Sequence, residues 1–455
     1  MSQVSCELLV VGGGTGGLRL ALMAARNGHD TVIAEPGVLG GTCLNTGCIP
    51  SKTLLHAAEL FLEMKRAREF GLHAADVRVD FGAVMQRMRR IVHEGQEHVV
   101  ESVQKRAHLR VIKGKALFVG KNEVQVGTRI VKAKRVVIAT GARASVPKIE
   151  GIDQVKAMVS DDVLLLKEQP HSLLVMGGGY IALELATFFN ALGTNVTVIE
   201  HNPRILKEVD EEVTQLLQPL YEQRGVRFLL GREIARVERE KAGVNVVVKQ
   251  GEKGKEEMKA THLLAATGRA PNSSGFGLEK AGVKVNERGA IIVNEFLETT
   301  AKGTYAMGDV TGRAPFAHAA KRESYIIMHN LFSRNKEAMP FSLVPWAVFT
   351  NPVIAAAGLS EARAKEQNIN YGVQRAEFKR AGRATVIGRT EGFVKVLYDK
   401  KTRKLLGAVI IGARADDLIH EYAALLTAGE TIDTLHKVIH IHPTLSEVNE
   451  ALSDV

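Results

Sequence analysis

The feature that most constrains this chain is a phosphate-binding pattern that occurs twice. In the first copy, a buried apolar strand at residues 8–11 leads into a glycine-rich turn and then an apolar helix. The glycines of this turn are Gly12, Gly14 and Gly17. Their spacing allows a tight turn, close approach to a pyrophosphate and close packing of helix on strand. Because a second strand at 31–34 ends at Glu35, which can accept a ribose hydroxyl, we expect a dinucleotide-binding unit rather than an ordinary turn.

The second copy repeats this plan further along the chain. A strand at 173–176 runs into glycines, and a following strand at 196–199 ends at Glu200. The turn and the start of its helix comprise Gly177, Gly179, Ile181, Ala182 and Glu184. Alanine at the third position is compatible with the pattern. Each copy is followed by an Ala-Thr-Gly turn, at residues 139–141 and 266–268, so the duplication extends over both units.

We therefore expect an α/β fold with two Rossmann-like dinucleotide-binding domains and a third, different domain. A chain of 455 residues is long enough for about three domains. From about residue 340 the pattern changes to short alternating strands followed by helices, which is typical of an α+β domain. The expected domains are residues 1–145 with 270–338, residues 146–269, and residues 339–455.

Two of the three cysteines, Cys43 and Cys48, stand in a glycine-bounded stretch directly before a run of helix formers. A helix N-terminus stabilises a thiolate, the form that attacks a disulfide, so this position suits redox exchange. A metal site would need two further ligands, for which His56 is the one close candidate, and none is expected. Two inert core cysteines are the other alternative. Cys6, at the start of the first strand, is expected to be a small core residue.

Composition excludes several classes of protein. Three cysteines are too few for a secreted disulfide framework, and neither a leader segment nor an apolar run of membrane-spanning length is visible. The net charge of +10 is dispersed and aromatic residues are 5% of the chain, so nucleic-acid binding is not expected. We expect a soluble, cytoplasmic protein whose charge forms a solvated surface or attracts an acidic partner or nucleotide phosphates.

The C-terminal segment at residues 438–447 has two interpretations. In a strand, His440 and His442 would share one face, and Glu447 in a following helix could orient His442 as a base toward a thiol. Alternatively, Thr444 and Glu447 form a helix capping box and His442 has no catalytic role. The residues alone do not decide between the two.

Lys52 and Glu184 each stand early in a helix that should face the junction of the two nucleotide units. Each could be an ordinary solvated charge. If they pair beside a flavin ring, Lys52 would stabilise negative charge there. Two nucleotide sites and a dithiol together indicate a relay, because a flavin can take two electrons from a dithiol and pass them on as hydride.

These motifs together resemble the pyridine nucleotide-disulfide oxidoreductases, and most closely the dihydrolipoamide dehydrogenases among them. The resemblance covers essentially the whole chain and is most specific at residues 41–52, 306–309 with 317–318, and 440–447. It implies FAD on the first unit, NAD on the second and a C-terminal dimerisation domain. The residues implied for FAD are Gly12, Gly14, Gly17, Glu35, Thr42, Lys52, Gly114, Ala116, Thr140, Gly141, Arg269, Asp309 and Ala317. Those implied for NAD are Gly177, Gly179, Ile181, Ala182, Glu184, Glu200 and Gly268.

The resemblance also implies a reaction. His442 of the partner subunit, oriented by Glu447, takes a proton from protein-bound dihydrolipoamide, and the resulting thiolate attacks Cys43. The Cys48 thiolate is then left against the flavin, and hydride passes to NAD. Because the site is completed across an interface, the resemblance implies an obligatory homodimer with a lipoyl-carrying protein as its substrate.

The choice of nucleotide and of substrate follows less directly. Glu200 favours a ribose hydroxyl over a 2′-phosphate, and hence NAD, although Ala182 and Arg204 are features that NADP enzymes of the family often carry. Thr46 and residues 344–352 depart from the usual dehydrogenase pattern. Related NAD(P)H-dependent disulfide or mercuric-ion reductases are alternatives, but mercuric reductase usually ends in a cysteine pair that this chain lacks. A flavin-bearing redox sensor is an alternative of another class, for which a paired histidine base would be unnecessary.

Overall fold

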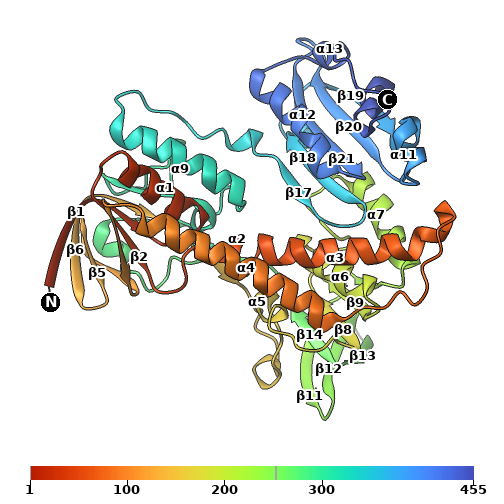
Figure 1. Cartoon of the computed structure of the whole chain (residues 1–455), viewed down its shortest axis with the longest axis horizontal. Helices are drawn as coiled ribbons and strands as arrows, with labels where there is room; N and C mark the ends of the chain where they lie inside the picture. Colours follow the sequence, from red (N-terminus) through yellow and green to blue (C-terminus); the bar gives the residue numbers. More distant parts are fainter. Residues whose placement is uncertain (1, 252–253, 455) are drawn as a thin grey trace.

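The computed structural model describes residues 2–251 and 254–454, so the expected outer domain limits at residues 1 and 455 lie outside the described residues. The described chain has the mixed α/β architecture that the duplicated pattern predicts. Two sheets with parallel cores and a separate antiparallel sheet at the C-terminal end form the three lobes visible in Figure 1.

The first sheet is built around β1 (Ser2–Val11), which pairs in parallel with β2 (Thr31–Glu35) and β6 (Arg129–Ile138). Its order is β3-β2-β1-β6-β5-β4, with β16 added beside β6. The other strands are β3 (Leu109–Lys113), β4 (Ala116–Gly120), β5 (Glu123–Val126) and β16 (Thr304–Ala306). Residues 8–11 of β1 are buried, as a central parallel strand requires. Helices α1 (Thr15–Arg26) and α9 (Ala317–Phe332) lie side by side next to this sheet (Figure 1).

The second sheet repeats the arrangement with β8 at its centre, in the order β10-β9-β8-β14. Its strands are β8 (Ser172–Met176), β9 (Asn195–Glu200), β10 (Arg227–Leu230) and β14 (His262–Ala265), and an antiparallel layer contains β11 (Ile234–Glu240), β12 (Gly243–Gln250) and β13 (Gly254–Ala260). The duplication extends to single hydrogen bonds. Gly13 N donates to Glu35 at 2.7 Å and Gly178 N donates to Glu200 at 2.5 Å, so the same turn-to-strand contact occurs in both units.

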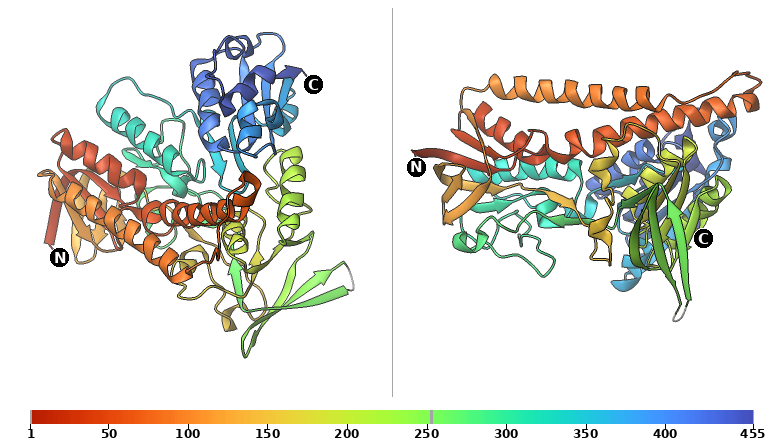
Figure 2. Two further views of the ribbon diagram at one scale, coloured as in Figure 1. Left: turned by 45° about the vertical axis from the view of Figure 1, so that its right-hand side comes forward. Right: turned by 90° about the horizontal axis from the view of Figure 1, so that it is seen from below.

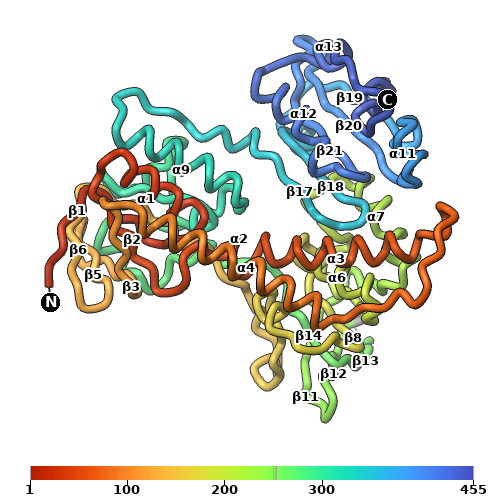
Figure 3. The backbone as a smooth tube through the Cα atoms, viewed as in Figure 1, coloured from red at the N-terminus to blue at the C-terminus, as the bar shows by residue number. Residues whose placement is uncertain are grey.

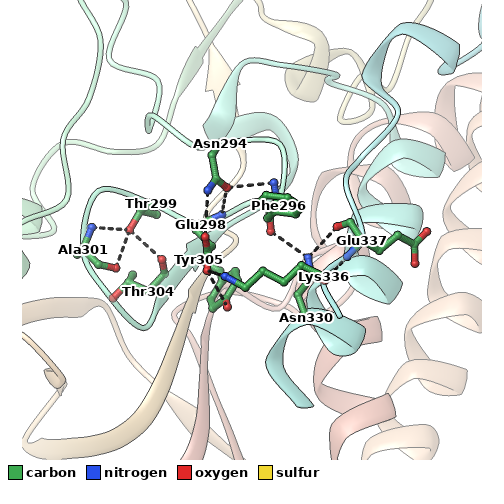
Figure 4. A network of polar contacts seen from close by, with 10 residues as sticks. All are labelled: Asn294, Phe296, Glu298, Thr299, Ala301, Thr304, Tyr305, Asn330, Lys336 and Glu337. Atoms are coloured by element: carbon green, nitrogen blue, oxygen red, sulfur yellow. Dashed lines mark hydrogen bonds and ion pairs between the residues drawn. The ribbon is translucent and has the colours of Figure 1, made fainter. Parts of the chain in front are cut away.

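Two short strands connect the units. β7 (Ala142–Ala144) pairs antiparallel with β15 (Arg269–Pro271) where the chain leaves and re-enters the first unit. Beyond this crossing, a polar network fastens the returning segment around β16 to the end of α9 (Figure 4). In it, Asn330 donates to the carbonyl of Phe296 at 3.3 Å, and Lys336 donates to Glu298 at 2.5 Å. The network therefore fixes the position of β16, and with it the segment that contains Asp309.

The cysteine stretch forms α2 (Gly41–Asn45) and the start of α3 (Cys48–Arg66), and α4 (Phe81–Gln104) returns beside α3. These two long helices run along one side of the molecule, past both sheets (Figures 2 and 3). Leu54 and Ala58 of α3 pack in one apolar core with Ala186 and Phe189 of α6 (Tyr180–Ala191). The cysteine helix therefore belongs to the core of the second unit, although its N-terminus meets the first.

The C-terminal part is an α+β unit, as expected. Its antiparallel sheet has the order β17-β18-β21-β20-β19-β22 and packs against α12. The strands are β17 (Trp346–Val348), β18 (Val353–Gly358), β19 (Tyr371–Glu377), β20 (Phe393–Asp399), β21 (Leu405–Gly412) and β22 (Ser453–Asp454). The helices are α10 (Glu361–Glu366), α11 (Gly382–Val386), α12 (Ala415–Ala428) and α13 (Ile432–Leu435).

The strand interpretation of residues 438–442 is wrong, because this segment has no regular secondary structure. A 3₁₀-helix, Leu445–Ala451, follows it. The remaining helices are α5 (Ser160–Val163), α7 (Glu211–Gln223), α8 (Leu278–Ala281) and 3₁₀ turns at Ala67–Phe70, Ile152–Gln154, Gly308–Thr311, Phe341–Leu343 and Phe378–Arg380. Across residues 2–251 and 254–454, each helix is too short or too polar to cross a membrane.

Candidate active site

The cysteine pair is held against the first glycine-rich turn. Gly40 and Gly41 have φ of +98° and +62°, and Gly40 N donates to the carbonyl of Gly13 at 2.8 Å. A Cβ at Gly41 would lie 2.5 Å from Gly14 Cα, so only glycine permits this approach. The backbone thus places Cys43 on α2 beside the phosphate-binding turn, and makes Cys48 the first residue of α3, as the sequence predicted.

The two cysteines are free thiols with opposite electrostatic environments. A hydrogen bond from the Cys43 thiol, with a smaller contribution from the nearby Lys52 ammonium, lowers the pKa of Cys48 to about 6 against the effect of burial. The same contact raises the pKa of Cys43, and burial adds to that increase. Cys48 is therefore the thiolate of the pair at neutral pH, while Cys43 retains the shared proton. Cys6 is buried, which raises its pKa to about 12 and agrees with a core role.

Lys52 and Glu184 form the ion pair suggested by their positions. Lys52 Nζ lies 2.7 Å from Glu184 Oε2, and the Glu184 side chain is only 7% exposed. Phe349 N donates to Glu184 Oε1 at 3.0 Å, and the Lys52 ammonium lies 4.5 Å from the centre of the Phe349 ring. Both Glu184 oxygens therefore have partners on α3 and on the C-terminal unit. Phe349 lies 165 residues from Glu184 in the chain, and no motif around it indicates this contact.

The first unit offers a site that fits a dinucleotide flavin. A Cβ at Gly12 would lie 2.3 Å from the Ala139 carbonyl oxygen, and no side chain caps the first turn of α1, so its N–H groups can meet phosphate oxygens. Gly114 follows directly after β3, and its N–H donates to the Glu35 carbonyl at 3.1 Å; Ala116 begins β4. Thr42 is on α2 beside Cys43. These residues are thus gathered at the C-terminal edge of the first sheet.

The far end of this site is formed where the two units cross. The Thr140 hydroxyl donates to the Asn272 carbonyl at 2.6 Å, and Asn272 N donates to the Gly141 carbonyl at 2.9 Å. Arg269 Nε lies 4.0 Å from Asp309 Oδ2, and burial raises the pKa of Asp309 despite this cation. Ala317 begins α9. Asn272 is a residue that sequence reasoning missed.

Glu323 of α9 is a second residue that sequence reasoning missed. Its side chain is fully buried, and Oε2 accepts a hydrogen bond from Gly308 N at 2.6 Å. Oε1 is buried without a hydrogen-bond partner in the described structure. Burial raises the pKa of Glu323 to about 7, and the Asp309 carboxylate contributes to the increase. Glu323 therefore fixes the main chain at Gly308, the residue immediately before Asp309.

A cavity of about 960 Å³ opens over the second unit. Its lining includes Gly177, Gly179, Ile181, Glu200 and Gly268 of the predicted nicotinamide set. No described residue lies within 4 Å of a Cβ built on Gly179, so the turn leaves room for a pyrophosphate. Ala182 and Glu184 do not line the cavity: Ala182 is fully buried beneath it, and Glu184 faces Lys52. Their assignment to nicotinamide binding stays a prediction.

Two charged side chains at the edge of this cavity, Glu200 and Arg204, bear on the predicted choice between a ribose and a 2′-phosphate. Glu200 is 8% exposed on its side chain, and Oε1 accepts Asn202 N at 2.7 Å while Oε2 accepts Gly178 N. Arg204 donates to the carbonyls of Lys207, of Leu206 at 3.3 Å and of Val209 at 2.8 Å. The arginine that suggested NADP is thus used to brace its own loop.

The contacts that the two interpretations of the C-terminal segment require of Glu447 are both present. His442 Nδ1 donates to Glu447 Oε1 at 2.6 Å, and Thr444 N donates to Glu447 Oε2 at 2.6 Å, so one carboxylate orients the imidazole and caps the helix. The His442 side chain is 79% exposed and that of Glu447 is 14% exposed. His442 lies between α13 and the 3₁₀-helix Leu445–Ala451, and α13 lies at the end of its lobe away from α2 in Figure 1.

Comparison with known proteins now decides the family. Residues 6–324 match the pyridine nucleotide-disulphide oxidoreductase family, and residues 344–452 match the dimerisation domain of the same family. The chain belongs to the pyridine nucleotide-disulphide oxidoreductases. It is accordingly a flavoprotein disulfide oxidoreductase with FAD and NAD(H) as cofactors.

Relatives within this family differ in the names of their reactions. Mitochondrial dihydrolipoyl dehydrogenase of Pisum sativum is 35% identical over 97% of this chain and 89% of that protein. Leghemoglobin reductase of Glycine max is 35% identical over 98% of this chain and 86% of that protein. The Cu(II) complex of RclA, an HOCl-induced flavoprotein disulfide reductase from Escherichia coli, has a TM-score of 0.88 at 29% identity, covering 98% of both chains. The pyridine nucleotide-disulphide oxidoreductase chemistry is common to these comparisons, and the electron donor or acceptor varies.

Proposed function

We propose that this protein is a dihydrolipoyl dehydrogenase that oxidises protein-bound dihydrolipoamide to lipoamide and reduces NAD⁺. The observation that carries this proposal is the histidine-carboxylate pair at 2.6 Å. Oxidation of a substrate thiol needs a base to take its proton, whereas electron transfer from NADH to the flavin does not. Relatives named dihydrolipoyl dehydrogenase, matched over nearly their full length, support the same substrate.

The reaction follows from the chemistry of the chain's own groups. Because Glu447 accepts the proton on His442 Nδ1, Nε2 is the nitrogen that can take a proton from a substrate thiol. The substrate thiolate attacks Cys43 Sγ in a Cys43–Cys48 disulfide, and Cys48 leaves as a thiolate, the form that its pKa of about 6 favours. The second substrate thiol, once deprotonated, displaces Cys43, which recovers a proton. Lipoamide is released and the dithiol remains.

Bound FAD supplies the two-electron link between this dithiol and the nicotinamide. The residues proposed to hold it are the glycine turn at residues 12–17, Glu35, the 140–141 turn and Asp309, with Lys52 beside Cys48 to stabilise negative charge. Gly177, Gly179 and Glu200 are proposed to hold NAD, and Glu200 to select it over NADP. The division into residues 1–145 with 270–338, residues 146–269 and residues 339–455 belongs to the same proposal.

We also propose that the working form is a homodimer. His442 lies on the C-terminal unit, whose residues match the family's dimerisation domain, whereas Cys43 lies on the first unit. A second copy would therefore bring its own base to the cysteine pair. Sedimentation of the purified flavoprotein tests this, and a monomer with full activity would contradict it.

The test of function is one assay series on the purified holoprotein. Flavin content is measured first, then reduction of NAD⁺ or NADP⁺ by dihydrolipoamide, and then oxidation of NADH or NADPH by glutathione disulfide or mercuric ion. The proposal predicts that dihydrolipoamide with NAD⁺ is the fastest pair and that C43S abolishes it. A lack of dihydrolipoamide activity with either nucleotide would contradict the proposal.

A second candidate is an NAD(P)H-dependent reductase of another disulfide or of a metal ion. It is favoured for a metal ion by the similarity to RclA, whose solved structure is a Cu(II) complex, and for an anionic disulfide such as glutathione disulfide by Lys321, whose charge acts on Cys43. In the same assay series, this candidate predicts faster turnover with glutathione disulfide, Cu(II) or mercuric ion than with lipoamide. If no acceptor or donor supports turnover, the redox-sensor alternative is favoured instead.

A further inference from the structure

The segment that carries His442 has little to hold it in place. Ile439 is 95% exposed, Ile441 is 79% exposed, and the His442 side chain is 79% exposed. Within the described chain, residues 439–442 make no main-chain hydrogen bond with other main-chain groups. A segment without a hydrogen-bond ladder and with outward side chains needs some other anchor if it is to hold a base in one position.

His440 has the environment of such an anchor. Its side chain is only 5% exposed, in contrast to the three side chains around it. Its Nε2 lies 3.1 Å from Glu421 Oε1 on α12, and its Nδ1 lies 3.5 Å from Glu450 Oε1 on the 3₁₀-helix Leu445–Ala451. The imidazole is therefore hydrogen-bonded to α12 through Nε2, while Nδ1 lies against the 3₁₀-helix without a hydrogen-bond partner in the described structure.

The partners of His440 are themselves fixed. Asn449 Nδ2 donates to Glu421 Oε2 at 2.9 Å, and the buried hydroxyl of Tyr422 bonds to Asn449 Oδ1. Asn449 lies on the same 3₁₀-helix as Glu447, which orients His442. One connected network thus joins α12, the 3₁₀-helix and the His440 side chain, and the Glu447 carboxylate projects from that same 3₁₀-helix.

We propose that His440 is a positioning residue for His442: it fixes the segment so that the exposed base keeps its 2.6 Å contact with the largely buried Glu447 carboxylate. This inference rests on the proposed thiol oxidation. A base must come within about 2.6–3.2 Å of the heavy atom whose proton it takes, or reach it through one water. A displacement of about 1 Å can slow a reaction by about 100-fold. His440 also lowers the pKa of Glu447 through its charge, so its loss affects the orienting carboxylate as well as the backbone.

The test compares two substitutions of His440 with a control in the same segment. His440→Leu removes both carboxylate contacts, and His440→Gln keeps one donor for Glu421. The control is His436→Gln, because the His436 side chain bonds to Gln374 of β19 at 2.8 Å and, in the described structure, makes no hydrogen bond with the His440 network. Each holoprotein is assayed for NAD⁺ reduction by dihydrolipoamide and for NADH oxidation by ferricyanide, which does not need the substrate base.

We expect His440→Leu to lower kcat with dihydrolipoamide by about 100-fold, with ferricyanide activity unchanged. His440→Gln should recover at least about tenfold of this loss, and the control should resemble the wild type. The pH profile of dihydrolipoamide oxidation should shift in His440→Leu, because Glu447 loses a nearby positive charge. Parallel loss of both activities, an unshifted profile, or full activity in His440→Leu would overturn the proposal.

Different results would contradict the proposed function and the anchoring role of His440. A wild-type protein without dihydrolipoamide activity contradicts the function, and the anchor is then tested by trypsin cleavage after Lys437, at the start of the segment. Faster cleavage at Lys437 in His440→Leu than in the His436→Gln control supports anchoring, and equal cleavage rates overturn it. If His440→Leu does not yield a folded holoprotein, the same comparisons are made with His440→Gln.

Discussion

Lys52 Nζ lies 2.7 Å from Glu184 Oε2, and this contact joins the N-terminal part of the cysteine helix to the helix of the second nucleotide unit. The carboxylate is 7% exposed and the ammonium 34% exposed, so water screens the lysine side more than the glutamate side. Because Cys48 is the first residue of the same helix, the pair acts on the thiolate directly. The ammonium lowers the pKa of Cys48, and the carboxylate raises it.

Substitution of the two partners should therefore move the pKa of Cys48 in opposite directions. Lys52→Ala should raise it above about 6, whereas Glu184→Gln should lower it. The measurement is the pH dependence of alkylation of Cys48 by iodoacetamide in the reduced holoprotein, with the modified cysteine identified by peptide mapping. A shift in the same direction for both variants would show that a change of backbone, and not charge, is responsible.

Glu323 predicts a pH dependence of stability. Its pKa rises from 4.5 to about 7 in the fold, so the folded state binds the proton more tightly than the unfolded state does. The stability that this proton provides is complete below pH about 4.5 and is lost as the pH rises through about 7, by roughly 3 kcal/mol in total. Glu323→Gln should remove this dependence while keeping an acceptor for Gly308 N. Melting of the two holoproteins at pH 5 and pH 8 checks it: the variant should gain relative stability at pH 8.

The second unit predicts which charge controls nucleotide choice. Glu200→Ser removes the carboxylate at the end of β9 and should raise the preference for NADP⁺ by about 10-fold, or about 1.4 kcal/mol. Arg204→Ala should weaken both nucleotides alike, since Arg204 braces carbonyls of its own loop at 2.8 and 3.3 Å. Steady-state kcat/KM for NAD⁺ and NADP⁺ separates the two effects. If Arg204→Ala selectively impaired NADP⁺, the side chain would be free to bind a phosphate after all.

The features predictable from the sequence are those encoded by local backbone requirements. The glycines at Gly12 and Gly177 sit in turns that other residues cannot adopt without clashes, so the two units and their strand ends follow from spacing alone. The pairing of Lys52 with Glu184 is also predictable from the sequence, because each residue stands near the start of a helix that faces the junction of the two units. Such local rules do not reach contacts that depend on how separate units pack.

Glu323, Phe349 and the C-terminal segment belong to that second group. Glu323 resembles any polar residue of an amphipathic helix until α9 is packed over Gly308. Residues 438–442 alternate histidine with isoleucine, which indicates a strand by periodicity, but Ile439 is 95% exposed and no neighbouring strand pairs with the segment in the described structure. The alternation is therefore not evidence of a strand here. The two exposed isoleucines beside His442 suit a contact with the second subunit of the proposed homodimer.

The last prediction concerns the two hydrogen bonds that the Glu447 carboxylate accepts. Its two oxygens each hold one neighbour, His442 Nδ1 and Thr444 N, both at 2.6 Å. The first contact is the larger cause of the lowered pKa of Glu447, so Glu447 stays ionised and orients His442 over the working pH range. Removal of the base by His442→Gln should slow dihydrolipoamide oxidation by about 100- to 10,000-fold.

Thr444→Val provides the matched control for this prediction. The Thr444 hydroxyl is buried without a hydrogen-bond partner in the described structure, and the contact with Glu447 uses the main-chain N–H, which valine keeps. We therefore expect Thr444→Val to oxidise dihydrolipoamide within about twofold of the wild-type rate, and His442→Gln to retain NADH oxidation by ferricyanide. Were Thr444→Val as impaired as His442→Gln, the packing around the buried Thr444 side chain, and not the base alone, would determine the rate.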